Sequence, residues 1–152
     1  MKLKVKTKVN CPINSVWEGF TEELFLSLNP PFPPVKLLRF DGSLKGDIVS
    51  LELNFILFKQ QWISEITEDY KEENKIGFVD KGVKLPFFLK KWQHHHLLVK
   101  DSESSTIIVD DIDFSTGTVL TDLLFYPSLL LQFLYRIPKY KSFFANRKNH
   151  NH

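Results

Sequence analysis

Two histidines and one aspartate in this chain have the residue types and spacing that acid–base chemistry or metal binding requires. His94 and His96 are two positions apart in the run 92–98, so on a strand both side chains point to one face of a sheet. Asp110 lies in a second alternating run, residues 108–114, and shares its face with apolar neighbours. The sequence therefore predicts a hairpin that carries two imidazoles and one carboxylate on its apolar face.

The register of this hairpin decides which imidazole meets the carboxylate. A closure centred on Ser102 places His94 opposite Asp110, whereas a closure centred on Glu103 places His96 there. Both registers put an aspartate beside a histidine, and we expect a ring nitrogen within about 3.2 Å of an Asp110 oxygen.

The three side chains can act in three ways. Two histidines and a carboxylate can bind a metal as in a catalytic zinc site. A His–Asp hydrogen bond can instead satisfy buried polar groups, or the pair can contact a ligand. His95 points to the opposite face, so three histidines do not converge. We expect structural pairing or ligand contact, with no metal ion and no cofactor.

Aromatic side chains on the same strands are candidates for the walls of a ligand cavity, although an aromatic residue in a strand also serves as ordinary core. No phosphate-binding glycine loop, Ser–His–Asp spacing or zinc-ribbon spacing occurs, so we assign no catalytic residue. The predicted ligand-binding residues are Trp62, Phe78, Trp92, His94, His96, Asp110 and Phe114.

The elements that must position these residues come in an unusual order. Lysines alternate with apolar residues over 2–9, which predicts a strand. Pro12 suits the first turn of a short helix, Thr21 can cap a second one, and the prolines of 29–34 stop it. Further strands are predicted at 35–40, 47–58, 60–70 and 75–80, followed by the two arms of the hairpin around the turn 100–105.

A helical pattern occupies the end of the chain from about Thr121 onward. Its leucines and phenylalanines are too dense for a one-sided surface helix, so we expect burial over a wide arc within a curved sheet. We expect the helix to begin near Pro127 and to be kinked or broken at Pro138, because proline removes a backbone hydrogen bond.

The bulk composition is that of a soluble globular protein, and its length suits one domain, residues 1–152. A net charge of +2 is too small to favour nucleic acid as a partner. Cys11 is the single cysteine, which excludes an intramolecular disulfide and fits a reducing compartment. The alternating N-terminus is no signal peptide, and the most apolar run is too short to span a bilayer. We expect a cytoplasmic protein without stable membrane insertion.

The order of elements resembles the helix-grip fold of the SRPBCC superfamily, which includes START and pollen-allergen-like proteins. The closest likeness is to bacterial ligand-binding members with a W-x-H-x-H motif, here Trp92, His94 and His96. Other matching positions are Phe78 and Asp80, Pro86 and Phe87, Thr106, Asp110, Ile112 and Phe114, Pro12 to Trp17, and Tyr135 with Arg136. The chain departs from the pattern in having Leu85 where a glycine is usual and Pro138 inside the last helix.

The resemblance implies an α+β protein in which a curved antiparallel sheet of six to seven strands surrounds a long C-terminal helix, in the order β-α-α-β-β-β-β-β-β-α. Such proteins typically enclose an apolar cavity between sheet and helix. Some bind lipids or steroids, some cyclise or dehydrate polyketides, and some act as co-chaperones.

Three functions remain open on this basis. We favour binding of a small, mostly apolar or amphipathic molecule, without catalysis. The alternatives are a polyketide cyclase- or dehydratase-like enzyme that uses the His and Asp side chains, and a co-chaperone-like interaction module. The binding hypothesis requires a cavity of at least about 300 Å³ beside the helix, bounded by Trp92, His94, His96 and Asp110.

Overall fold

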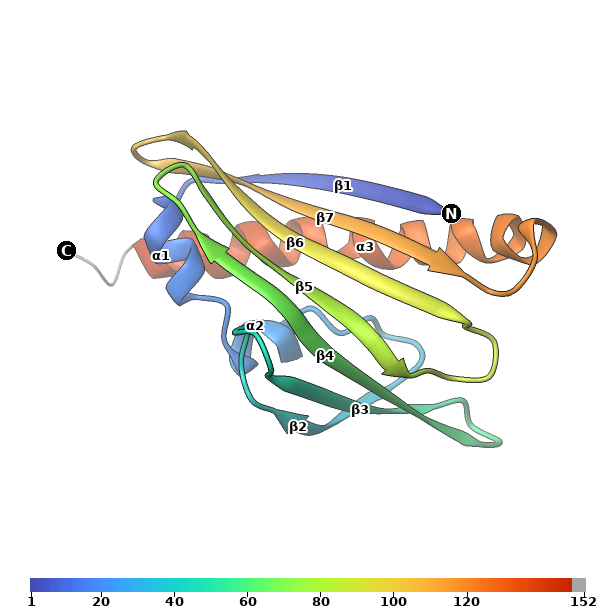
Figure 1. The fold of residues 1–152 in the computed structure, drawn as a ribbon. Helices are drawn as coiled ribbons and strands as arrows, with labels where there is room; N and C mark the ends of the chain where they lie inside the picture. Colours follow the sequence, from blue (N-terminus) through green and yellow to red (C-terminus); the bar gives the residue numbers. More distant parts are fainter. Residues whose placement is uncertain (149–152) are drawn as a thin grey trace.

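The computed structural model describes residues 1–148 and shows a curved sheet with one long helix lying along it (Figure 1). Two short helices lie near one end of the sheet. The elements are β1 (Lys2–Val9), α1 (Ile13–Glu18), α2 (Glu22–Ser27), β2 (Val35–Phe40), β3 (Ile48–Asn54), β4 (Lys59–Lys71), β5 (Lys75–Lys84), β6 (Lys91–Ser102), β7 (Ser105–Ser115) and α3 (Val119–Lys148).

All seven strands belong to one antiparallel sheet in the order β1-β7-β6-β5-β4-β3-β2. The predicted α+β architecture and the helix-grip arrangement are confirmed. The strands β2 to β7 are neighbours in the sheet in the order of the sequence. β1 pairs with β7 and forms the edge of the sheet opposite β2. This connection places the N-terminal strand next to the strand that precedes α3.

Strict alternation explains β1. Its residues are alternately exposed and buried, with the lysines outside and Leu3, Val5, Thr7 and Val9 inside. Apolar side chains on one face of the strand bury surface against α3, while lysines on the other face remain in water. β1 therefore forms part of the wall along which α3 lies (Figure 1).

Both short helices start as predicted. Pro12 precedes α1, and the Thr21 hydroxyl accepts a hydrogen bond from the Leu24 backbone N–H at the start of α2. Together with the last turns of α3 they bury one apolar cluster, which includes Val16, Leu24, Tyr140 and Phe144. A second cluster forms near the start of α3 around Trp92, Ile112, Phe114, Leu129 and Phe133.

The C-terminal helix differs from the prediction at three points. It begins at Val119, before Pro127, and it continues through both Pro127 and Pro138 without a break. Both prolines are exposed, so water can hydrate the carbonyl groups that lose their intrahelical partner. Burial over a wide arc is also wrong, because several leucines on the outer face of α3 are exposed to solvent. None of the helices within residues 1–148 is long and apolar enough to cross a membrane.

Substitution of Phe144 tests how α3 packs against the short helices. Its side chain is completely buried, and a Cβ added at Gly19 would lie 2.5 Å from its ring. We expect Phe144→Ala to lower the free energy of unfolding by about 3–5 kcal/mol, because the short helices cannot collapse into the void. Leu134→Ala, on the exposed face of the same helix, should cost about 0.5 kcal/mol or less. Urea unfolding followed by circular dichroism measures both, and equal losses would contradict this packing.

Candidate functional site

The central hairpin adopts the register in which His96 lies opposite Asp110. The side chains nevertheless pair diagonally. His94 Nε2–H donates to Asp110 Oδ1 at 2.9 Å, whereas His96 Nε2–H donates to Asp80 Oδ2 at 2.9 Å. The expected His–Asp110 hydrogen bond is therefore present, and it comes from the histidine that is not directly across the ladder.

Asp80 is the site residue that reasoning from the hairpin alone missed. It lies on β5 directly opposite His94, and its Oδ1 accepts a hydrogen bond from Trp92 Nε1–H at 3.1 Å. Its other oxygen lies 3.6 Å from His94 Nδ1. The signal was available in the sequence, because Phe78 and Asp80 alternate on one strand as His94 and His96 do.

Helix α3 completes the cluster from the other side. Tyr140 Oη–H donates to Asp110 Oδ1 at 3.4 Å, and Arg136 Nη1 lies 3.8 Å from the same oxygen. The guanidinium of Arg136 also sits 4.4 Å above the Phe133 ring. Spacing of four residues puts Arg136 and Tyr140 on one helix face, a pattern that sequence reasoning did not use.

Burial and charge set the protonation states in this cluster. Burial, with a smaller contribution from His96, lowers the pKa of His94 to about 4, so its imidazole is neutral at pH 7. Burial alone would raise the pKa of both carboxyls. The His96 hydrogen bond holds the pKa of Asp80 below its usual value, and the His94 hydrogen bond does the same for Asp110. Burial and the nearby Asp110 charge raise the pKa of Tyr140, which remains a phenol.

The imidazoles belong to an aromatic stack. The His94 and His96 ring centroids are 3.6 Å apart at an interplanar angle of 31°, and Phe78 stacks on His96 at 4.2 Å and 10°. Trp92 meets Trp62 edge to face at 4.8 Å. These contacts fix the rings, so the polar cluster has a defined orientation before anything binds.

Asp80, His94 and His96 are close enough together to consider a metal ion, because one ligand atom from each lies within 4.8 Å of the others. The ring geometry opposes it. A metal binds in the plane of each imidazole at about 2.0–2.1 Å, and two nearly parallel stacked rings have no shared point at that distance. One ring would have to leave its stack and its hydrogen bond. The arrangement suits paired hydrogen bonds, which orient both imidazoles.

A cavity of about 310 Å³ lies between the sheet and α3, with the polar cluster in its wall. Leu51, Leu53 and Ile66 from the sheet and Leu129 from α3 contribute apolar wall. The lining is mostly aromatic and aliphatic; it contains the buried polar cluster and, elsewhere, the polar side chains Thr21, Asn29, Ser43 and Ser128. The polar lining side chains near the cluster are Ser64, Asp80, His94, His96, Gln132, Arg136 and Tyr140.

Five of the seven predicted ligand-binding residues line this cavity: Trp62, Phe78, Trp92, His94 and His96. Asp110 lies behind His94, almost completely buried, and does not reach the cavity wall. Phe114 is completely buried in the apolar cluster near the start of α3. Both residues support the wall from behind.

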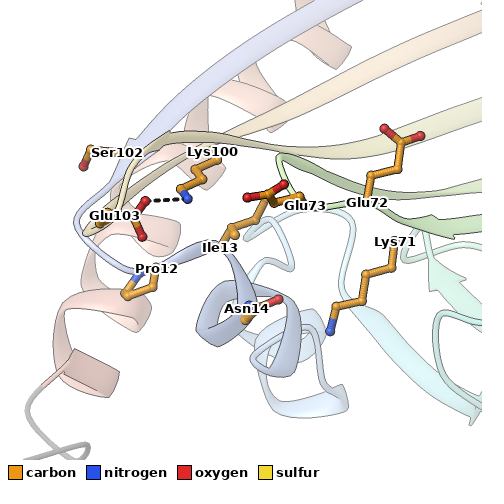
Figure 2. Close-up of a pocket in the computed structure, with 9 residues that line it drawn as sticks. All are labelled: Pro12, Ile13, Asn14, Lys71, Glu72, Glu73, Lys100, Ser102 and Glu103. Atoms are coloured by element: carbon orange, nitrogen blue, oxygen red, sulfur yellow. Dashed lines mark ion pairs between the residues drawn. The ribbon is translucent and has the colours of Figure 1, made fainter.

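A second depression lies at the opposite end of the central hairpin, with a volume of about 500 Å³ (Figure 2). Its residues come from the start of α1 and from the β4–β5 and β6–β7 turns. Lys100 and Glu103 form an ion pair of 2.6 Å within the β6–β7 segment that lines it (Figure 2). Its charged side chains are largely exposed, so the depression has neither the aromatic wall nor the buried polar groups of the cavity beside α3.

No protein-family model matches the chain, and no curated protein does. Solved structures do resemble it. The Zhui aromatase/cyclase from Streptomyces sp. R1128 is 13% identical with a TM-score of 0.68, covering 100% of this chain and 96% of that one. A norcoclaurine synthase point mutant from Thalictrum flavum is 11% identical with a TM-score of 0.65, at 100% and 96% coverage. Protein CV1439 from Chromobacterium violaceum is 14% identical with a TM-score of 0.65, at 93% and 96% coverage. Identities this low show the fold alone, which is the helix-grip fold.

The pKa of His94 gives the site a pH signature. Between about 6.5, its ordinary value, and about 4, its value in the folded chain, only the unfolded chain takes up the proton. The free energy of unfolding should therefore fall as pH is lowered through this window, by on the order of 3 kcal/mol. The two carboxylates, whose pKa values lie below the usual range, lose their contribution only at lower pH.

Urea unfolding at a series of pH values measures this dependence. Burial also lowers the pKa of His95, which adds a slope of the same sign, so the informative quantity is the difference between the wild type and His94→Gln. The variant should lose most of the slope between pH 6.5 and 4. An unchanged slope would mean that His94 is not held neutral by burial.

Proposed function

We propose that this protein binds a small, mostly apolar molecule in the cavity between the sheet and α3, with the polar end of that molecule at the His–Asp cluster. The observation that carries the proposal is the cavity itself, whose mostly aromatic and aliphatic walls contain one buried polar cluster. A pocket of about 300 Å³ is at the lower end of the range for small-molecule sites, so the ligand would be small.

The walls would supply most of the affinity. Each Å² of apolar ligand surface removed from water contributes about 25 cal/mol, so shape and size dominate binding in such a pocket. The polar cluster would supply orientation. Arg136 offers N–H donors at the cavity wall, and His96 and Asp80 present a fixed donor–acceptor pair there. A ligand with one hydroxyl, carbonyl or acidic group at one end fits this division.

A second candidate is acid–base catalysis on a carbonyl-containing ligand. It is favoured by the His96–Asp80 hydrogen bond at the cavity wall and by the neutral state of His94, since a neutral imidazole can accept a proton. The structural neighbours named as an aromatase/cyclase and a norcoclaurine synthase are enzymes on the same fold. A filled interior would have favoured the interaction-module alternative, and the cavity argues against it.

Filling the cavity tests binding directly. Gln132 lies on α3 at the cavity wall and is partly exposed, so a larger side chain can enter without disturbing the core. We expect Gln132→Trp to abolish retention of the small molecule that co-purifies with the wild type from its own host. Native mass spectrometry of the intact protein gives the measurement. Lys36→Trp, on the exposed side of β2, is the matched control and should retain the molecule. A wild-type protein that carries no ligand and binds none from a host extract would contradict the proposal.

Substitutions at Asp110 distinguish an effect on ligand positioning from an effect on folding. In Asp110→Asn the amide oxygen can still accept the hydrogen bond from His94 Nε2–H, so the fold should persist. The Arg136 side chain loses its charge partner and gains freedom at the cavity wall. We expect ligand preference to change while the free energy of unfolding falls by about 1–3 kcal/mol. Asp110→Leu leaves His94 without an acceptor and should cost more. Competition between neutral and acidic ligands for the cavity, with urea unfolding as reference, distinguishes the two effects.

A further inference from the structure

The outer face of α3 carries a row of exposed leucines. Leu120, Leu123, Leu124, Leu131 and Leu134, here called the leucine stripe, have exposed fractions between 41% and 73%. They recur at helical spacing and so form one continuous surface along the first half of α3. Residues 123–135 contain no charged side chain. A contiguous exposed apolar surface of this kind marks an interaction site more often than chance.

The leucine stripe runs beside the opening of the cavity. Ser128 lies between Leu124 and Leu131 on the helix surface, is exposed, and also lines the cavity. Phe32, from the proline-rich loop after α2, also lines the cavity and is 55% exposed. Whatever covers the leucine stripe therefore also faces the entrance.

A second apolar group lies at the same end of the molecule, at the turn between β3 and β4 (Figure 1). Ile56 and Leu57 there are 81% and 91% exposed. A series of contacts between aromatic rings connects this turn with α3. Phe58 contacts Phe87, Phe87 contacts Phe88, and Phe88 contacts Phe125, with ring centroids 5.5–5.7 Å apart in each pair. These ring contacts end at Phe125, which lines the cavity, so the turn and the leucine stripe are two exposed apolar groups at one end of the molecule.

The charged side chains of α3 are basic, with one exception that is buried. Its only acidic residue, Asp122, is buried and accepts hydrogen bonds from Thr116. The basic residues follow the leucine stripe, and helical geometry places Lys139 and Lys141 on its two flanks. A helix with an apolar face, basic flanks and no exposed acid has the pattern of a segment that lies in the surface of an anionic membrane.

We propose that the leucine stripe and the β3–β4 turn dock this protein onto an anionic lipid bilayer, with the cavity opening towards the lipid. The helix is not apolar enough to span a membrane, so it would lie along the interface. A protein partner on this face would close the entrance, whereas a bilayer covers the leucines and is itself a source of apolar molecules. Loading of the cavity from the bilayer rests on the proposed function, while docking does not.

Sedimentation with lipid vesicles tests docking. The probes are vesicles of phosphatidylcholine and phosphatidylglycerol in equal amounts, and vesicles of phosphatidylcholine alone. We expect the wild type to bind the anionic vesicles, and to bind them less in high salt because the Debye length shortens. Leu124→Ser with Leu131→Ser should weaken this binding by about tenfold or more, since both side chains are exposed in solution and buried on docking.

The basic flanks are tested separately. Lys139→Gln with Lys141→Gln should weaken binding to the anionic vesicles roughly 30-fold, at about 1 kcal/mol for each lysine near the surface. The matched control is Leu44→Ser, which changes an exposed leucine in the β2–β3 turn, outside the leucine stripe, and should leave binding unchanged.

Two results would overturn docking. One is the absence of binding to anionic vesicles at low salt. The other is a wild-type dimer, seen by analytical ultracentrifugation, that the double serine variant converts to monomer, because the leucines would then be covered by a second copy of the chain. Native mass spectrometry on the same preparations reports ligand binding independently. Vesicle binding without any ligand would sustain docking and overturn only the proposed function.

Discussion

Two carboxylates inside the protein impose the constraint on which the rest of the structure depends. Asp80 and Asp110 are held below their usual pKa values although burial opposes ionisation, so each must receive hydrogen bonds from fixed donors. The donors come from β6 and from α3. An unpaired buried carboxylate costs several kcal/mol, so a one-residue slip of β6 or a rotation of α3 would be strongly unfavourable. The cluster thereby fixes the relation between sheet and helix.

The same cluster divides the interior. One apolar cluster packs around Phe144 and the short helices, and the other around Trp92 and the start of α3. Polar side chains between them cannot be covered by aliphatic ones without loss of hydrogen bonds. The space that remains beside His94, His96 and Arg136 is the cavity. The presence of a buried polar cluster in a mostly apolar lining is therefore a consequence of how the carboxylates are satisfied.

The inside and the outside of α3 have complementary roles in the functions that we propose. Its inner face presents Arg136 to the cavity, where it can orient a ligand. Its outer face presents leucines between basic flanks, where they can contact a membrane. One helix then connects the source of an apolar molecule to the site that holds it. Neither role requires a large conformational change, because Ser128 already lies at both the cavity and the surface.

Alternation along strands was enough to predict much of this protein, because side-chain direction in a strand has a period of two. It predicted β1, the hairpin, the shared face of His94 and His96, and a His–Asp hydrogen bond. The order of elements along the chain, with its final helix, agreed with a helix-grip fold. These features are local or concern the order of elements in the chain, whereas the pairing of β1 with β7 joins elements that are far apart in the sequence.

Only the tertiary structure decided which partners meet. The alternation of side chains along a strand assigns each residue to one face of the sheet. The diagonal pairing of His94 with Asp110 depends in addition on the direction of the side chains across a twisted sheet. Asp80 joined the site through the β5–β6 register, and Tyr140 through the rotation of a helix distant in sequence. Leucine density predicted a widely buried α3, yet within residues 1–148 the leucine stripe of that helix is exposed. Burial depends on what packs against a residue, and for this helix that was decided by a sheet that curves around only one of its sides.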